Sequence, residues 1–189
     1  GEIPITPSLV EDETVCLTIE KVGFTSSRLA ELKPGEKVFL RGPYGNGFNL
    51  SLPGKYLLVG GGTGAASLTP AYLRLMEEEV ETLFLVGGRS RENLVYVGKL
   101  RELGARFWIA TDDGSEGFKG VLPEFFEQVV SANRFENVLA IGPEKMMVKI
   151  AEKCLEQGIV CQVSLVRIVK CGLGICGSCV LDPVGLRVC

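Results

Sequence analysis

Hydrophobic and polar positions follow two different patterns along the chain. In the first fifty residues, the stretch 15–22 alternates apolar and polar side chains, which is typical of a strand with one buried face. A second strand is predicted over 37–41, and a short capped helix over 28–32. We therefore expect β-barrel material in this part, which ends near Leu52-Pro53-Gly54.

After residue 53, buried strands alternate with helices. The predicted strands cover 56–60, 82–87, 105–111, 137–141 and 159–163. The predicted helices between them cover 65–80, 95–103, 121–130 and 144–157. Repeated strand–helix–strand units indicate a parallel sheet with helices on both faces, so the predicted fold class is α/β plus β.

The composition changes this picture mainly through what it excludes. The 189 residues include no histidine, which excludes serine–histidine and cysteine–histidine catalysis and histidine-ligated metals. Any chemistry must therefore come from cofactors. A net charge of −3 offers no basic surface for nucleic acid, and no apolar run is long enough to span a bilayer. Free cysteines without a targeting segment favour the reducing cytoplasm.

Four of the seven cysteines gather at the end of the sequence. Cys171, Cys176, Cys179 and Cys189 have the spacing C-x4-C-x2-C-x9-C. The first three follow the plant-type [2Fe-2S] spacing, which takes one more thiolate from downstream, and interleaved glycines allow the sharp turns that wrap a cluster. A four-cysteine zinc site is the main alternative, although structural zinc usually shows two close pairs. A disulfide framework would suit a small secreted chain better.

A glycine-rich turn joins the predicted strand 56–60 to its helix. Its sequence matches the pattern G-x-G-x-x-A, in which the backbone approaches a pyrophosphate at the start of a helix. The residues assigned to this contact are Gly60, Gly62, Thr63 and Gly64. The alternative is a tight turn that only packs helix against strand.

The residues after the next predicted strand leave open whether such a turn would bind NAD or NADP. An acidic residue is expected about 20 residues after the glycines, where it binds the ribose of NAD. Here the strand 82–87 is followed by Arg89 and Arg91 instead. Two arginines suit a 2′-phosphate, so NADP remains open beside NAD.

Two further loops follow predicted strands, and open parallel sheets bind ligands at this end of their strands. After 137–141, Gly142 would let a nicotinamide ring lie against the strand, with Pro143 and Met146 beside it. The alternative is that Met146 and Met147 belong to the core. After 105–111, Asp112 belongs to a polar loop that is alternatively a simple turn.

A cluster of hydroxyl side chains follows Gly23. Thr25, Ser26 and Ser27 could donate hydrogen bonds to a phosphate, and the alternative is that they cap the following helix.

In this order, the motifs resemble the ferredoxin-reductase superfamily, and within it the electron-transfer subunits of NAD-linked dihydroorotate dehydrogenases. The stretches that carry the resemblance are 42–48, 60–65, 111–115, 142–147 and the terminal cysteines. The resemblance implies an FAD-binding barrel over 1–52, an NAD-binding α/β domain over 53–163 and a [2Fe-2S] segment over 164–189. The family usually has an arginine where Ile3 stands. It also has further barrel strands before this point, so the chain is expected to be a fragment, and whether it retains FAD is left open.

The resemblance also implies cofactor contacts and a path for electrons. It places Ile3, Pro4, Ile5 and Thr6 at the flavin edge, where Thr6 would hydrogen-bond the flavin, and the turn 23–27 at the flavin pyrophosphate. Electrons would pass from dihydroorotate to the FMN of a partner catalytic subunit in a heterotetramer. They would then pass through [2Fe-2S] and FAD to NAD+, in pyrimidine biosynthesis.

Two other functions remain open at this point. The loop 41–48 would equally suit a gamma-type flavin and iron–sulfur subunit of a soluble hydrogenase or sulfite reductase. If the cysteines bound zinc, the chain would be a non-catalytic zinc-binding interaction module.

Overall fold

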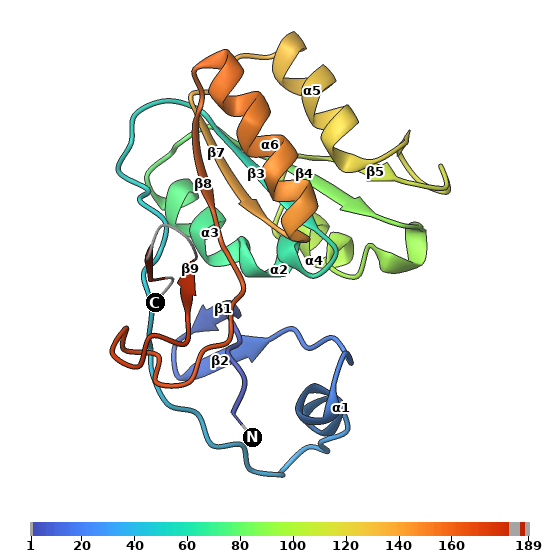
Figure 1. Ribbon diagram of the computed structural model, residues 1–189. Helices are drawn as coiled ribbons and strands as arrows, with labels where there is room; N and C mark the ends of the chain where they lie inside the picture. Colours follow the sequence, from blue (N-terminus) through green and yellow to red (C-terminus); the bar gives the residue numbers. More distant parts are fainter. Residues whose placement is uncertain (1, 182–185, 188–189) are drawn as a thin grey trace. The chain divides into compact units, whose positions relative to one another are not determined.

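A six-stranded parallel sheet forms the centre of the larger of two units into which the chain divides (Figure 1). The computed structural model describes residues 2–181 and 186–187. The larger unit comprises Pro7–Thr18 and Phe48–Ser164, and the smaller one takes the remaining described residues. The three functional domains expected from the sequence stay a prediction.

The strands of this sheet lie in the order β6-β5-β4-β3-β7-β8, and neighbouring strands are parallel throughout. Their bounds are β3 Tyr56–Gly61, β4 Thr82–Gly88, β5 Phe107–Thr111, β6 Phe118–Lys119, β7 Asn137–Ile141 and β8 Val160–Val163. The chain first moves outward from β3 to β6 and then returns to the other side of β3 with β7. The sheet therefore has a topological switch point between β3 and β7, where such folds bind ligands.

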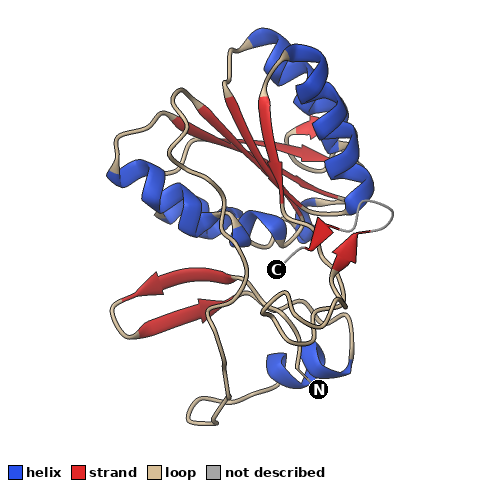
Figure 2. Cartoon of the chain, turned by 60° about the vertical axis from the view of Figure 1, so that its left-hand side comes forward, coloured by secondary structure: helices blue, strands red, loops and turns tan. Residues whose placement is uncertain are grey.

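Helices cover both faces of the sheet (Figure 2). One face carries α2 (Gly64–Ser67), α3 (Thr69–Glu77) and α4 (Val97–Glu102), and the other carries α5 (Leu122–Ala132) and α6 (Glu144–Gln157). A 3-10 helix, η1, spans Arg91–Asn93. Right-handed crossovers produce this division. The helices that connect β3 to β4 and β4 to β5 lie on one face, and those that lead to β7 and β8, on the other side of β3, lie on the opposite face.

The core lies where β3 and β4 pass between the two helix layers. Leu57, Leu58 and Val59 are fully buried, and so are Phe84 and Leu85. Because both faces of the sheet are covered, its strands appear in the sequence as continuous apolar runs rather than as alternating patterns.

The predicted α/β elements are confirmed, most of them within two residues at each end. The exception is the predicted helix 65–80, which forms two helices, α2 and α3, that meet at Leu68. Pro70 lies in the first turn of α3 and cannot donate the amide hydrogen bond that a continuous helix would need there. The two-residue strand β6 is too short to leave a pattern in the sequence.

The expected partial barrel is not formed by the described part of residues 1–52. Its strands there are β1 (Pro7–Glu11) and β2 (Thr14–Leu17), which pair as an antiparallel hairpin and belong to the larger unit. β2 stops at Leu17, which pairs with Pro7, the first residue of β1. The observed strand therefore ends earlier than the predicted strand 15–22. Residues 37–41 are not a strand, since no neighbouring strand pairs with them.

The smaller unit has little regular structure. It contains α1 (Phe24–Ala30) and a short antiparallel pair, β9 (Val180–Leu181) and β10 (Leu186–Arg187). Of all the helices within the described residues, none is both long enough and apolar enough to cross a membrane.

Candidate functional site

The carboxyl ends of the parallel strands meet at one edge of the sheet in the larger unit. Gly60 of β3 pairs with Val86 on one side and Ile141 on the other, and Gly88 pairs with Thr111 at the end of β5. The glycine-rich turn, the arginines after β4, the loop after β5 and the Gly142 turn therefore all follow strands at this edge. These four segments thus lie at one edge of the sheet, and their contact with a dinucleotide stays a prediction.

The glycines of the first turn serve different purposes. A Cβ at Gly60 would lie 2.6 Å from the Cα of Ala65, and one at Gly64 would collide with the carbonyl oxygen of Ile141. These two glycines let α2 pack closely on β3 and β7, as the packing alternative predicts. Gly62 has a φ of +58° and no atom within 4 Å of its Cβ position. Gly62 is therefore the glycine of this turn that leaves open space, and Thr63 follows it as the N-cap of α2.

Met146 fills the space that two glycines leave at the switch point. A Cβ at Gly142 would lie 2.7 Å from the Met146 Cε, and one at Gly61 would lie 2.7 Å from the Met146 Sδ. Met146 is half-buried there, beside Pro143, whereas Met147 is buried in the core. The core alternative thus holds for Met147. The sequence did not single out Gly61, because the four glycines of the turn cannot be told apart by their pattern.

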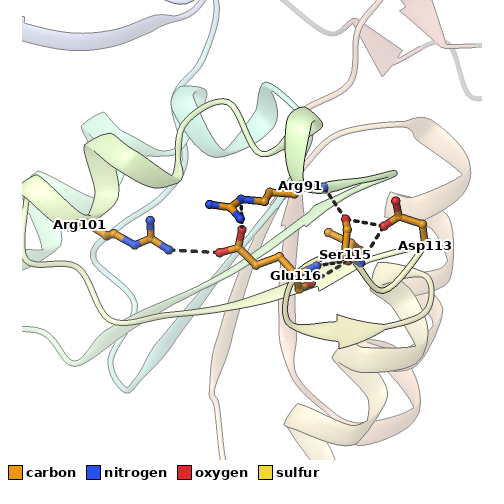
Figure 3. Close-up of polar contacts among 6 residues, drawn as sticks. Arg91, Arg101, Asp113, Ser115 and Glu116 are labelled. Carbon is orange, nitrogen blue, oxygen red and sulfur yellow. Dashed lines mark hydrogen bonds and ion pairs between the residues drawn. The ribbon is translucent and has the colours of Figure 1, made fainter.

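The loop after β5 is tied to the end of β4. The amide of Asp112 donates to the carbonyl of Gly88 (3.1 Å), while the Asp112 side chain is exposed. Asp113 accepts hydrogen bonds from the Ser115 hydroxyl (2.6 Å) and amide (2.9 Å), which lower the pKa of its carboxyl (Figure 3). The sequence did not single out Glu116 of the same loop, because its partners Arg91 and Arg101 come from other segments.

In the smaller unit, the hydroxyl cluster starts a helix. The Ser26 hydroxyl accepts hydrogen bonds from the amides of Val22 (3.1 Å) and Gly23 (3.0 Å) and donates to the Gly23 carbonyl (3.1 Å). Ser26 is buried, so the structure favours the capping alternative for this residue. Thr25 and Ser27 are half-buried, and their contact with a phosphate stays a prediction.

The N-terminal segment assigned to the flavin edge is irregular. Ile3, Pro4 and Thr6 are exposed, and Ile5 is half-buried. No contact that would fix Thr6 as a hydrogen-bond donor stands out among the described residues, and its role stays a prediction.

Arg41 holds the start of the cysteine loop. Its guanidinium donates to the carbonyls of Lys170 (2.7 Å) and Cys171 (2.9 Å). The same group donates to the carboxylate of Glu2 (2.7 and 2.9 Å), and this hydrogen bond lowers the Glu2 pKa. The guanidinium also lies 5.1 Å from the centre of the Tyr44 ring. Arg41 directly precedes the loop 42–48, which carried part of the family resemblance, and it is thus in direct contact with the cysteine segment.

The backbone of the loop is arranged around its sulfur atoms. The amide of Leu173 donates to the Cys171 Sγ at 3.3 Å. Amides of Cys176, Leu173 and Ile175 together lower the pKa of Cys171 to about 6, and the Ser178 amide lowers that of Cys176. Such hydrogen bonds stabilise a thiolate, which is the form that binds a metal.

The ligand set itself is only partly visible. Cys179 is buried, and Cys189 lies outside the described residues. Within the described part of the chain, no three His, Cys, Asp or Glu side chains come together as a metal-sized group. The [2Fe-2S] cluster therefore stays a prediction. Glycines at 172, 174 and 177 do have the positive φ values that the sequence predicts for a tightly wound loop.

Solved structures define the class of protein. The chain matches a chain of an NADH-dependent reduced ferredoxin–NADP oxidoreductase with a TM-score of 0.84 and 32% identity, over 94% of this chain and 65% of that one. A cytochrome P450 reductase of Amycolatopsis has a TM-score of 0.62 at 22% identity, over 84% and 54% of the two chains, and shows the fold alone. The fold is thus that of ferredoxin-reductase-like, FAD- and NAD-binding reductases.

Related sequences then define the family. A Methanopyrus kandleri protein is 42% identical over 188 residues, which are 100% of this chain and 71% of the relative. A Thermoplasma volcanium protein is 40% identical over 189 residues, or 100% and 70%. Both carry the name "Probable dihydroorotate dehydrogenase B (NAD(+)), electron transfer subunit". The chain belongs to this family of oxidoreductase subunits, which confirms the predicted resemblance. No protein-family model matches the chain.

Proposed function

We propose that this chain carries electrons between a partner dehydrogenase and NAD+. In this proposal, dihydroorotate is oxidised at the FMN of a separate catalytic subunit, and the electrons leave through the present chain for use in pyrimidine biosynthesis. The observation that carries the proposal is the similarity to relatives of that name, which extends over the whole of this chain at 42% and 40% identity.

The cysteine loop is the proposed point of electron entry. Cys171, Cys176, Cys179 and Cys189 would hold a [2Fe-2S] cluster, which supplies single-electron transfer when it is bound. Two features support the fit: amides directed at the Cys171 sulfur, and positive φ values at the intervening glycines. Zinc would use the same thiolates, so the metal must be identified by chemical analysis.

The two nucleotide sites are proposed in separate parts of the chain. FAD, which exchanges single electrons for a hydride when it is bound, would contact the segment Ile3–Thr6 and the turn at Gly23, Thr25 and Ser27. NAD+ would lie along the carboxyl edge of the sheet. The residues proposed there are Gly60, Gly62, Thr63, Gly64, Asp112, Gly142, Pro143 and Met146.

Exposed apolar side chains around the cysteines support a protein partner. Val166, Ile168 and Ile175 are between 73% and 75% exposed, and Leu173 is 58% exposed. Large apolar side chains gathered in one short segment are typical of interaction surfaces. We propose that this segment docks on the FMN-containing catalytic subunit, in a heterotetramer. The six described cysteines are free thiols, which supports a cytoplasmic location.

Co-production of the chain with a dihydroorotate dehydrogenase catalytic subunit tests this function. We expect the two to purify together, with flavin, iron and acid-labile sulfide, and to reduce NAD+ when dihydroorotate is added. Zinc without sulfide, or no complex, would contradict the proposal.

A second candidate function comes from the structural match at 32% identity, whose title names an NADH-dependent reduced ferredoxin–NADP oxidoreductase. In that case the chain would exchange electrons with reduced ferredoxin instead of with a dihydroorotate-oxidising subunit. Adding reduced ferredoxin and NADP+ to the same preparation, in place of dihydroorotate and NAD+, separates the two candidates.

A further inference from the structure

We infer that Glu116 makes the dinucleotide site selective for NAD over NADP by neutralising Arg91, which follows β4, and Arg101 of α4. This inference rests on the proposed binding of a dinucleotide at the carboxyl edge of the sheet. The sequence leaves this choice open, because Arg89 and Arg91 stand where an acidic residue is expected. The structure brings an acidic residue, Glu116, to that place from the loop after β5.

Glu116 forms ion pairs with two arginines. Its carboxylate lies 3.5 Å from the Nε of Arg91 and 3.2 Å from the Nη2 of Arg101 (Figure 3). The Glu116 side chain is 27% exposed, whereas those of Arg91 and Arg101 are 77% and 61% exposed. The carboxylate is therefore the shielded centre of the group, and the two guanidinium groups reach it from the solvent side.

The backbone of Glu116 is fixed by a buried threonine. The Thr111 hydroxyl donates to the Glu116 carbonyl (2.7 Å) and accepts from the Glu116 amide (3.0 Å), and Thr111 is fully buried. On the facing loop, the Arg91 amide donates to the Ser115 hydroxyl (2.7 Å), which in turn donates to Asp113. These hydrogen bonds fix the backbone positions from which the Glu116 and Arg91 side chains meet.

Glu116 and its two arginines lie where dinucleotide-binding sheets recognise the adenosine ribose. In dinucleotide-binding sheets, the 2′ position of that ribose lies near the end of the second strand, where an acidic residue accepts a hydrogen bond from the hydroxyl of NAD. β4 takes this place here. An exposed ion pair adds little stability, so the main effect of Glu116 is on the local charge.

The charges at this place balance. Arg89, Arg91, Arg101 and Lys119 contribute four positive charges, and Glu92, Asp112, Asp113 and Glu116 contribute four negative ones. The amides of Asp112 and Asp113 donate to the carbonyls of Gly88 and Arg89, so both acids lie at the end of β4. A 2′-phosphate carries about −1.5 to −2 charges at neutral pH and needs unpaired cations, whereas a 2′-hydroxyl does not.

The test is the binding of NAD+ and NADP+ to the unmodified chain and to Glu116→Gln, measured by titration calorimetry without turnover. Glutamine keeps the shape of the side chain but removes its charge. A unit charge about 6 Å from a phosphate, partly screened by salt, is worth about tenfold in Kd. We expect the Kd for NADP+ to fall by about this factor, while the Kd for NAD+ changes little.

Two further variants control the interpretation. Glu92→Gln removes an equal charge from an exposed residue next to Arg91, and it should leave the ratio of the two Kd values unchanged. Adding Arg91→Gln and Arg101→Gln to Glu116→Gln should abolish the gain in NADP+ binding, because both freed guanidinium groups are then missing.

The outcomes separate this inference from the function on which it rests. If the unmodified chain binds neither nucleotide, the proposed dinucleotide site is wrong and the inference is overturned with it. If it binds NAD+ but Glu116→Gln leaves the Kd ratio unchanged, or if it already prefers NADP+, only the role of Glu116 is overturned.

Discussion

Arg41 shows how one side chain can join distant parts of a sequence. It reaches the carbonyl of Cys171, 130 residues away, and the carboxylate of Glu2, 39 residues away. Arginine suits this role because its planar guanidinium presents several donors at fixed angles. The chain that enters the cysteine loop is therefore held before its first sulfur.

Replacing Arg41 with glutamine should loosen that entry. We expect Arg41→Gln to retain less iron and acid-labile sulfide per chain and to lose its visible absorbance faster in the presence of a chelator. Arg28→Gln, an equal change of charge at an exposed helical residue, serves as the control. Equal iron and sulfide contents in the two variants would contradict a positioning role for Arg41.

The hydroxyl of Ser115 should control the titration of Asp113. Its hydrogen bond, together with that from the Ser115 amide, holds the native pKa of Asp113 below the unfolded value of about 3.9. The ionised carboxylate is therefore favoured in the folded state. Its stabilising contribution is present above about pH 4 and is lost as the pH falls through the native pKa.

We expect Ser115→Ala to raise the pKa of Asp113 towards its ordinary value, as measured by an NMR titration of the carboxyl carbon. An unchanged Asp113 titration would show that the hydrogen bonds do not persist in solution.

At the scale of secondary-structure elements, the close approach of α2 to β3 is decided by one missing side chain. Gly60 lies so near Ala65 that a Cβ would meet backbone atoms at 2.6 Å, and backbone cannot move aside as a flexible side chain can. Neither helix propensity nor strand propensity contains this information, because it depends on how the two elements pack.

Gly60→Ala should accordingly destabilise the fold, by about 1–3 kcal/mol as is usual for overpacked sites. Gly98 in α4 is the matched control, since its Cβ position has no atom within 4 Å and its φ is negative. Gly98→Ala should raise the free energy of unfolding by about 0.5–1 kcal/mol, because alanine favours helix. Chemical denaturation of both variants checks the opposite signs.

At the scale of the whole molecule, the central expectation is that the cysteine loop and the nucleotide edge serve one electron path. Replacing Cys176 with serine should abolish partner-dependent reduction of NAD+, because one cluster ligand is lost. Transfer from NADH to a dye needs only the nucleotide and flavin sites, and it should largely persist in chains that bind FAD.

Steady-state assays of the complex, with both reactions measured on one preparation, check this prediction. Cys16→Ser, an exposed thiol outside the cysteine loop, is the control and should leave both reactions intact. If Cys176→Ser also left both intact, the cluster would not lie on the electron path.

Local signals in the sequence determined most of the α/β part. The strand 137–141 and the helix 144–157 were predicted with their observed bounds, since Pro143 starts the helix and Gly158, at a φ of +67°, ends it. The spacing of the terminal cysteines likewise identifies thiolate chemistry without any structure. Such features depend on residues that are close together along the chain.

Only the tertiary structure decided the features that depend on distant partners. Residues 37–41 have the composition of a strand but no neighbouring strand to pair with, so they form none. Glu116 meets Arg91 because β4 and β5 are adjacent in the sheet, and Arg41 meets Cys171 across 130 residues. A contact between distant segments is fixed by how the elements pack, and a pattern of neighbouring residues cannot encode it.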